Sequence, residues 1–376
     1  MEYRTLRGSE EKISLLGFGC MRLPRLHPDK PDVDAALGQS MVDYAYAHGV
    51  NYFDTAYPYH DGLSEPFIGA ALRKYPRESY NLVTKLPTYL LKEESDVRRY
   101  FDEQLQKCGV DYFDYYLVHA LNASRLELIE TLHVFEQLCE LKAEGKIRHI
   151  GFSFHDKPDV LERVLAAHDW EFAQIQLNYL DWELQDARRQ YELIEQKGIQ
   201  CIIMEPVRGG MLATLTPEAV DCFKRADPDA STASWAIRYA ASLPNVLTVL
   251  SGMSNLEHVT DNIATMEPFA PLTAADRRVI DEALTTYQKA VTIPCTGCRY
   301  CMDCPSGVDI PGVFAAYNRY ATSKSRAMFE ELYHALTQDE RAEHCIACGA
   351  CVPQCPQHID IPAQMCAICQ LAAQGA

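Results

Sequence analysis

The stretch GVNYFDTAYPYHDGLSE, at positions 49–65, contains the unit from which most of this chain is built. Its short apolar run at 51–54 predicts a buried β-strand, and the pattern that begins at Ser64 predicts a helix. Between residue 14 and about residue 265 we count eight such pairs. Nearly continuous apolar strands that alternate with helices are typical of a parallel sheet covered by helices.

The eight predicted strands are rich in Val, Ile, Leu, Phe and Tyr, and they occupy residues 14–19, 51–54, 80–85, 112–119, 147–152, 172–177, 200–205 and 246–250. Several predicted helices end at a glycine, which fits a left-handed helix cap. Eight repeats in this length favour a closed (β/α)8 TIM barrel over an open sheet. An open dinucleotide-binding sheet is expected to carry GxGxxG after its first strand, whereas residues 17–24 read GFGCMRLP.

The composition of the chain predicts a soluble globular protein with a large core, because 48% of its 376 residues are hydrophobic and 23% are charged. Its formal charge of −17 argues against nucleic acid or an anionic membrane as a partner. The polar start of the chain and the lack of a long apolar stretch predict a cytoplasmic protein with no membrane span.

Ten of the fifteen cysteines follow residue 294, in groups too tight for sensible disulfide pairing. In a reducing compartment such groups indicate metal binding. The run CIACGACVPQCP at 345–356 has the bacterial ferredoxin spacing CxxCxxCxxxCP, and the run CTGCRYCMDCP at 295–305 has a last gap that is one residue shorter.

In paired runs of this kind, three cysteines bind one [4Fe-4S] cluster and the fourth reaches the neighbouring cluster. We therefore assign one cluster to Cys295, Cys298, Cys301 and Cys355, and the other to Cys345, Cys348, Cys351 and Cys304. The alternative is zinc, whose sites usually separate two CxxC pairs by a dozen or more residues. Because the gap before Cys304 is one residue short, one incomplete cluster remains an alternative to two complete ones. Cys366 and Cys369 are interpreted as packing residues or spare thiols.

The sequence predicts three parts: a barrel over 1–270, a linker and helix over 271–293, and a small, mainly α-helical domain with two [4Fe-4S] clusters over 294–376. Residues 319–343, between the cysteine runs, are expected to be helical. This insert resembles the α-helical ferredoxin type. Each cysteine run of this chain is followed by a similar segment, SGVDIPGVF at 306–314 and QHIDIPAQM at 357–365.

Polar residues that end the predicted barrel strands are candidates for an active site, since parallel barrels carry their active sites at the carboxyl ends of the strands. Asp54, Lys85 and His119 end three successive strands, and Tyr59 lies in the loop after the first of these. Taken singly, each has an ordinary structural explanation. Asp54 could cap a turn, Lys85 could be a strand-end lysine that reaches solvent, His119 could be a hydrogen-bonded core histidine, and Tyr59 could pack within its loop.

Together, these four residues resemble the catalytic tetrad of the aldo/keto reductase family, as do the motifs TKLP, LVHA and HIGFS after the next three strands. The resemblance covers roughly residues 1–270 and implies a nicotinamide-dependent enzyme that interconverts a small carbonyl and an alcohol. It implies that Tyr59 donates the proton, that Lys85 eases proton loss from the phenol, and that Asp54 holds Lys85 in place. His119 would orient the carbonyl. The whole chain is similar to the iron–sulfur-bearing branch of this family.

The resemblance also implies cofactor contacts: Ser153 and Gln174 would bind the nicotinamide amide, and residues 251–262 would wrap the adenosine end through Gly252, Ser254 and Asn262. Two positions depart from the family pattern. Met204 stands where many members have a tyrosine that stacks on the nicotinamide, and His258 stands where many have an arginine for the 2′-phosphate. The choice among NAD, NADP and flavin therefore stays open.

A nicotinamide moves two electrons as hydride, whereas each [4Fe-4S] cluster moves one, and three arrangements follow from this mismatch. In the first, the barrel reduces carbonyls and the clusters are structural or sense oxygen. In the second, a flavin in the barrel splits the electron pair and the clusters exchange electrons with a partner protein. In the third, the chain is a redox-sensing subunit with a vestigial site, against which the intact tetrad argues. The sequence indicates neither the substrate nor the oligomeric state.

Overall fold

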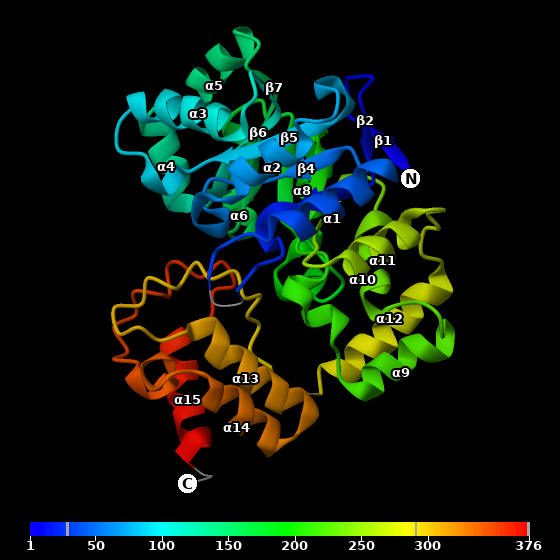
Figure 1. Ribbon diagram of the computed structural model, residues 1–376, viewed down its shortest axis with the longest axis vertical. Helices are drawn as coiled ribbons and strands as arrows, with labels where there is room; N and C mark the ends of the chain where they lie inside the picture. The colour runs from blue at the N-terminus through cyan, green and yellow to red at the C-terminus, as the bar shows by residue number, and fades with distance from the viewer. Residues whose placement is uncertain (28–29, 290–291, 374–376) are drawn as a thin grey trace. The chain divides into compact units, whose positions relative to one another are not determined.

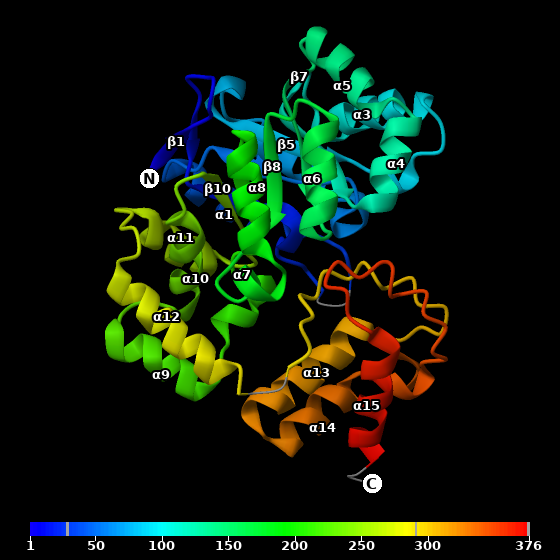
Figure 2. The ribbon, with the colours of Figure 1, turned by 180° about the vertical axis from the view of Figure 1, so that it is seen from behind.

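The computed structural model describes residues 1–27, 30–289 and 292–373, which Figures 1 and 2 show from opposite sides. It divides into two compact units, Met1–Pro206 with Ser234–Leu272, and Val207–Ala233 with Thr273–Ala376. Residues 290–291, inside the predicted linker, and 374–376, at the end of the predicted cluster domain, lie outside the described residues. Among the described helices, none is long and apolar enough to cross a membrane.

The first unit confirms the predicted (β/α)8 TIM barrel. Its strands pair in parallel and close into a ring in which the last strand lies beside the first. In order around the barrel they are β3 (Leu16–Gly19), β4 (Tyr52–Asp54), β5 (Asn81–Leu86), β6 (Phe113–Leu121), β7 (Ile147–Phe154), β8 (Phe172–Gln176), β9 (Gln200–Met204) and β10 (Val246–Gly252).

Helices surround these strands, as Figures 1 and 2 show. They are α1 (Ala35–Ala47), α2 (Ser64–Leu72), α3 (Ser95–Cys108), α4 (Ala123–Thr131), α5 (Val134–Ala143), α6 (Pro158–Ala167), α7 (Asp181–Leu184), α8 (Ala187–Lys197), α10 (Thr232–Ala241) and α11 (Leu256–Met266), with the 3₁₀ helices η1 (Cys20–Arg22), η2 (Tyr59–Gly62), η3 (Arg77–Ser79) and η4 (Thr88–Leu90). As predicted from sequence, α3 and α8 end at glycines with positive φ, Gly109 and Gly198.

A hairpin that the sequence did not predict precedes the barrel and is formed by β1 (Tyr3–Thr5) and β2 (Lys12–Ser14). The first barrel strand therefore begins at Leu16, two residues later than the predicted start at Ser14, because Ser14 pairs with Tyr3 in the hairpin. The hairpin side chains Leu6 and Ile13 join one buried cluster with barrel residues such as Tyr115. The hairpin thus closes the amino-terminal end of the barrel.

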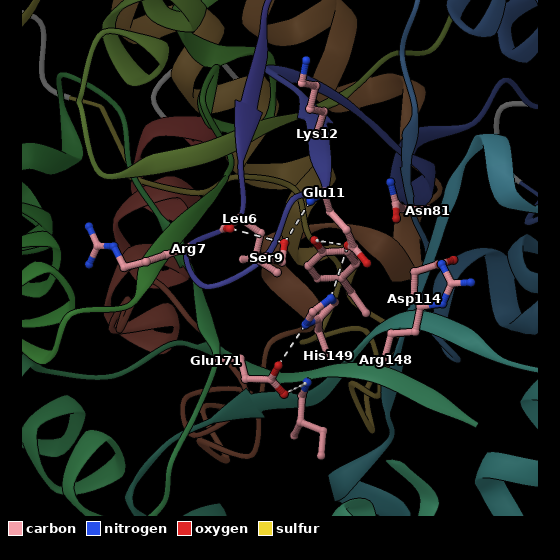
Figure 3. A network of polar contacts seen from close by, with 12 residues as sticks. Leu6, Arg7, Ser9, Glu11, Lys12, Asn81, Asp114, Arg148, His149 and Glu171 are labelled. Carbon is pink, nitrogen blue, oxygen red and sulfur yellow. Dashed lines mark hydrogen bonds and ion pairs between the residues drawn. The ribbon is translucent and has the colours of Figure 1, made fainter. Parts of the chain in front are cut away.

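A polar network fixes the hairpin to the barrel (Figure 3). His149 on β7 lies between two carboxylates, with its Nε2 3.2 Å from Glu11 of the hairpin and its Nδ1 2.9 Å from Glu171. Tyr115 donates a hydrogen bond to Glu11 at 3.3 Å. Burial alone lowers the pKa of His149, but hydrogen bonds and charge from the two glutamates outweigh it and raise the pKa to about 9. The imidazole is therefore charged at neutral pH.

The second unit is helical, with α9 (Pro217–Ala226) packed against α12 (Ala274–Tyr287), and with α13 (Ile310–Ser323), α14 (Arg326–Ala335), α15 (Ile361–Ala373), η5 (Arg208–Ala213), η6 (Gln338–Glu340) and η7 (Ala342–His344). Its core contains Phe314, Phe329 and Ile368. The helix expected over 319–343 is instead two helices, because Lys324 adopts a left-handed conformation and Ser325 caps the start of α14.

The His149 network predicts a pH dependence of stability. A histidine whose pKa rises from 6.5 in the unfolded chain to about 9 in the folded chain stabilises the fold fully below pH 6.5 and loses that effect as the pH rises through 9. Between pH 6.5 and 9 we expect the free energy of unfolding of the native protein to fall more than that of His149→Gln, with a difference of at most about 3 kcal/mol. Urea unfolding of the two proteins, followed by tryptophan fluorescence, measures this difference. Equal slopes for the two proteins would contradict the role of the network.

Candidate functional site

The four predicted catalytic residues meet at the carboxyl ends of neighbouring strands. Asp54 is the last residue of β4, Lys85 lies near the end of β5, and His119 lies near the end of β6. Tyr59 begins η2, a few residues after β4. Because β4, β5 and β6 pair side by side in parallel, the topology brings residues that are far apart in sequence to one edge of the barrel.

Lys85 is the centre of this group. Its buried Nζ donates hydrogen bonds to Asp54 Oδ1 at 2.6 Å and to the backbone carbonyl of Thr55 at 2.7 Å, and it lies 3.4 Å from the hydroxyl of Tyr59. Burial raises the pKa of Asp54, and the charge and hydrogen bond of Lys85 oppose that rise. Asp54 and Lys85 therefore form a buried ion pair that directs an ammonium group at the phenol.

The phenol of Tyr59 has a pKa well above 10, chiefly because of burial and secondarily because of the negative charges of Asp54 and Glu205. A neighbouring ammonium alone would lower the pKa of a phenol, but burial raises it more. Tyr59 is consequently protonated at neutral pH, as a proton donor must be. The contact with Lys85 becomes important once the proton has left, because the ammonium then faces a phenolate.

His119 is buried beside Tyr59, with the two rings edge to face at 6.3 Å between centroids. Burial, followed by the charges of Lys85 and Arg125, lowers its pKa well below 6.5, so the imidazole is neutral. Its Nδ1 has no hydrogen-bond partner among the described residues. A neutral imidazole has one N–H to donate and one nitrogen that accepts, which suits a residue that orients a carbonyl oxygen.

Four buried residues with polar groups behind Lys85 were missed by the sequence analysis. Gln104 on α3 donates to the backbone carbonyl of Lys85 at 3.0 Å and to the carboxylate of Glu65 at 2.7 Å, and Thr84 donates to the same carboxylate at 2.7 Å. Tyr116 in turn donates to Gln104 at 2.6 Å. The available signal was a glutamine among the mostly apolar side chains that the helix at 95–108 buries.

Ser153 and Gln174, predicted to bind the nicotinamide amide, are direct neighbours across β7 and β8 and are both buried. Ser153 Oγ accepts a hydrogen bond from the backbone N–H of Ala120 at 2.7 Å. Gln174 Nε2 lies 3.6 Å from Met204 Sδ, and its Oε1 has no hydrogen-bond partner among the described residues. A buried acceptor without a partner costs free energy, so this pair fits a ligand that brings an N–H group, such as a carboxamide.

The residues predicted for the adenosine end lie between β10 and α11. Gly252 ends β10 and, like Ser254, is exposed. Asn262 is buried on α11 and donates to Ser251 at 2.9 Å. The imidazole of His258 accepts a hydrogen bond from the backbone N–H of Ser254 at 3.3 Å, so this ring packs back on the loop.

The structure brings the predicted ligands of the first cluster together. Burial raises the pKa of Cys301 to about 12, and nearby Cys298, Cys295 and Cys355 raise it as well. Cys355 belongs to the second run in sequence, yet it lies with the first group in space. This is the exchange of the fourth cysteine that the reciprocal assignment requires.

The predicted ligands of the second cluster surround one cavity, which is lined by Cys304, Cys345, Cys348 and Cys351 together with residues such as Val308, Ile310, Ile361, Pro305 and Pro362. Burial raises the pKa of Cys351, and Cys345, Cys304 and Cys348 contribute in the same direction. Cys304, from the first run, therefore lies with the second group despite its shorter gap.

The described residues contain no group of three His, Cys, Asp or Glu side chains that converges on a single metal ion. A zinc site draws all its ligands to one ion, whereas the thiolates of a [4Fe-4S] cluster each bind a different iron. Cys366 is exposed on α15, whereas Cys369 packs against the core of the second unit.

Comparisons with known proteins match both parts of the chain. The model of the aldo/keto reductase family matches residues 15–285, and that of a 4Fe-4S dicluster domain matches residues 294–359. The L-galactose dehydrogenase of Arabidopsis thaliana is 28% identical over 308 residues, which cover 75% of this chain and 93% of that protein. The NADH-specific methylglyoxal reductase of Escherichia coli is 25% identical over 299 residues, covering 68% and 90%.

A probable aldo-keto reductase of Glycine max is 29% identical over 207 residues, which cover 53% of this chain and only 57% of that protein. Among solved structures, an aldo-keto reductase of Bacillus halodurans in its holo form has a TM-score of 0.62 and 28% identity, covering 75% of this chain and 96% of that one. The solved structure and the family model thus agree on the barrel.

The Asp54 and Lys85 pair predicts a large cost for removing one partner. We expect Asp54→Asn to lower the free energy of unfolding by about 3 to 5 kcal/mol, because it leaves a buried ammonium without its carboxylate. Adding Lys85→Met should recover most of this loss. The control is Glu183→Gln, which breaks an exposed pair with Arg188 of the same 2.6 Å length and should cost about 1 kcal/mol or less. Similar costs for Asp54→Asn and Glu183→Gln in chemical unfolding would disprove the burial argument.

Proposed function

We propose that this chain, which belongs to the aldo/keto reductase family and is an oxidoreductase, interconverts a carbonyl and an alcohol with a nicotinamide dinucleotide, NADH or NADPH. The observation that carries this proposal is the buried Lys85, hydrogen-bonded to Asp54 at 2.6 Å and 3.4 Å from the hydroxyl of Tyr59. An ammonium held in this way has one clear chemical use, which is to stabilise the phenolate that proton donation leaves behind.

When bound, the dinucleotide supplies a hydride to the carbonyl carbon or removes one from the alcohol carbon. Tyr59 donates its phenolic proton to the carbonyl oxygen, and the resulting phenolate is stabilised by Lys85. Asp54 keeps Lys85 charged and pointed at Tyr59. His119, neutral and buried, hydrogen-bonds the carbonyl oxygen and orients it. In the oxidation direction the phenolate accepts the alcohol proton.

The fit of the dinucleotide rests on Gln174 and Ser153 at its nicotinamide end. The unpartnered Oε1 of Gln174 would accept a hydrogen bond from the carboxamide N–H₂. We propose that Gly252, Ser254 and Asn262 bind the adenosine end of the dinucleotide. The name of the Escherichia coli relative specifies NADH, and His258 here lacks the permanent charge of an arginine that would bind a 2′-phosphate, so we propose NADH as the first cofactor to test.

The carboxyl-terminal part binds iron–sulfur clusters, as its match to a 4Fe-4S dicluster domain indicates. We propose two [4Fe-4S] clusters, one on Cys295, Cys298, Cys301 and Cys355 and the other on Cys345, Cys348, Cys351 and Cys304, in a domain that begins near residue 294. Each cluster exchanges one electron at a time. The cavity bounded by the second four cysteines supports this division.

Met204 favours a second candidate function, in which a flavin occupies the barrel and the clusters exchange electrons with a partner protein. Its thioether, next to Gln174 at the end of β9, replaces the aromatic ring that would stack on a nicotinamide. An absorption spectrum of the anaerobic protein before and after denaturation separates the two candidates. Released flavin would establish the second, and carbonyl-dependent oxidation of NADH without flavin would establish the first.

Tyr59→Phe tests the catalytic assignment. We expect turnover of a small carbonyl, with methylglyoxal as the first of a panel, to fall by about 10²- to 10⁴-fold because the proton donor is gone. Tyr57→Phe is the matched control, since this neighbouring hydroxyl donates to Glu103 on α3. Dinucleotide binding, measured by fluorescence, should be unchanged in both. Full turnover in Tyr59→Phe would rule out Tyr59 as the acid.

Cys304→Ser tests the cluster assignment. The native chain purified without oxygen should contain about eight irons and the electron paramagnetic resonance signals of two reduced [4Fe-4S] clusters. We expect Cys304→Ser to disturb the second cluster alone, whereas Cys366→Ser should keep all the iron. Stoichiometric zinc without iron, or loss of the first cluster in Cys304→Ser, would refute the assignment.

A further inference from the structure

The amide of Gln104 on α3 connects several segments around the active site. Its side chain is 0% exposed, and so is that of Glu65, which it contacts. Gln104 Nε2 donates to Glu65 Oε1 at 2.7 Å and to the backbone carbonyl of Lys85 at 3.0 Å. Its Oε1 accepts a hydrogen bond from the hydroxyl of Tyr116 at 2.6 Å. Both ends of the amide are therefore hydrogen-bonded, as the burial of an amide requires.

The contacts of this amide reach the segments that carry the tetrad. Tyr116 lies on β6, three residues before His119. Lys85 lies on β5, the strand that pairs with β6. Glu65 lies in the first turn of α2, six residues after Tyr59. One amide thus links three segments that are distant in sequence, and each of them carries or adjoins a different tetrad residue.

Glu65 is a costly residue to bury at this place. Burial raises the pKa of its carboxyl group, and hydrogen bonds from Thr84 and Gln104 and the charge of Lys107 oppose that rise. Its Oε2 lies 3.9 Å from Lys107 Nζ and has no hydrogen-bond partner among the described residues. A buried carboxylate with incomplete partners costs free energy that an apolar side chain of similar size would not. Stability alone would therefore favour an apolar residue at this position.

The carbonyl that Gln104 binds belongs to Lys85 itself. At the other end of that residue, Nζ lies 2.6 Å from Asp54 Oδ1 and 3.4 Å from the hydroxyl of Tyr59. The attraction between an ammonium and a phenolate weakens as their distance grows. A misplacement of about 1 Å in a reacting group can lower a rate by about 100-fold. A hydrogen bond to the backbone of Lys85 therefore bears on the chemistry at its ammonium.

We propose that Gln104 and Glu65 are positioning residues, which hold the backbone of Lys85 so that its ammonium stays beside the phenol of Tyr59. This inference rests on the proposed carbonyl chemistry. Both residues act through Lys85 and neither touches the substrate. Without the amide, the end of β5 gains freedom and the mean distance from Nζ to the phenol grows. The phenolate left by proton donation is then less stable, so turnover slows and the pKa of Tyr59 rises.

The test is the steady-state kinetics of Gln104→Leu over a range of pH, in the full chain and with the carbonyl and dinucleotide that the native protein turns over. We expect kcat to fall by about 10- to 100-fold with little change in KM, because the substrate-binding groups are untouched. In both directions the pH profile should move to higher pH, since the phenol loses its proton less readily. A mere loss of folded protein would lower the amount of active enzyme and leave the pH profile in place.

Gln200→Leu is the matched control. This buried glutamine begins β9, at the amino-terminal end of the barrel, where its amide accepts from the backbone N–H of Arg7 at 2.6 Å and donates to the carbonyl of Thr5 at 3.2 Å. The control should change neither kcat nor the pH profile. Both variants leave in place the residues whose charges act on the pKa of Tyr59, which include Asp54, Glu205, Cys20 and Arg22.

Glu65 allows a conservative comparison. Glu65→Leu removes the acceptor that fixes the amide of Gln104, and it should slow turnover as Gln104→Leu does. Glu65→Gln keeps an oxygen that can accept from Thr84 and Gln104, so it should restore most of the kcat that Glu65→Leu loses. The losses in Glu65→Leu and Gln104→Leu should not add in the double variant, because both residues act through one network.

Native kcat and an unshifted pH profile in folded Gln104→Leu would overturn the proposal. If that variant does not fold, Tyr116→Phe carries the test, because it removes only the hydroxyl that donates to the amide. It should lower kcat by about 3- to 10-fold, with the same direction of pH shift, and a native result there would overturn the proposal. A native chain that turns over no carbonyl, or full turnover in Tyr59→Phe, would instead refute the proposed function.

Discussion

The chemistry of the barrel depends on one buried ion pair. Placing the ammonium of Lys85 in a dry interior is unfavourable unless a charge and hydrogen bonds compensate it, and Asp54 and the carbonyl of Thr55 provide both at 2.6 and 2.7 Å. The barrel allows this ion pair to form because the last residues of its parallel strands lie at the same edge. The closed ring, the helices outside it and the hairpin plug beneath it all hold three neighbouring strands rigidly enough for this pair to form.

Burial acts differently on each member of the site. It keeps Tyr59 protonated and His119 neutral, and it strengthens the interaction between Lys85 and Asp54. The same physical cause therefore leaves a protonated phenol, a neutral imidazole and a fixed cation, which are the three states that the proposed proton transfer requires. The network of Gln104, Glu65 and Thr84 behind Lys85 extends this polar arrangement into the wall of the barrel, where a partly satisfied group would otherwise destabilise the fold.

The second unit combines a small helical core with two groups of cysteines. The two proposed ligand sets differ in their surroundings, since Arg208 donates a hydrogen bond to Gln357, two residues after Cys355, and an apolar cavity lies among the other four cysteines.

The sequence by itself determined the repeating strand and helix pattern, the tetrad residues and the cysteine spacings, because periodicity, strand ends and ligand spacing are local properties of the chain. It did not reveal the hairpin plug at Leu6 and Ile13, the break at Lys324 or the burial of Arg208. Only the tertiary structure decided these features, since each depends on which distant segments meet. The pKa of Tyr59 shows the same division. Its neighbours Lys85 and Asp54 were predictable from sequence, but the burial that chiefly raises this pKa arises only when the barrel closes.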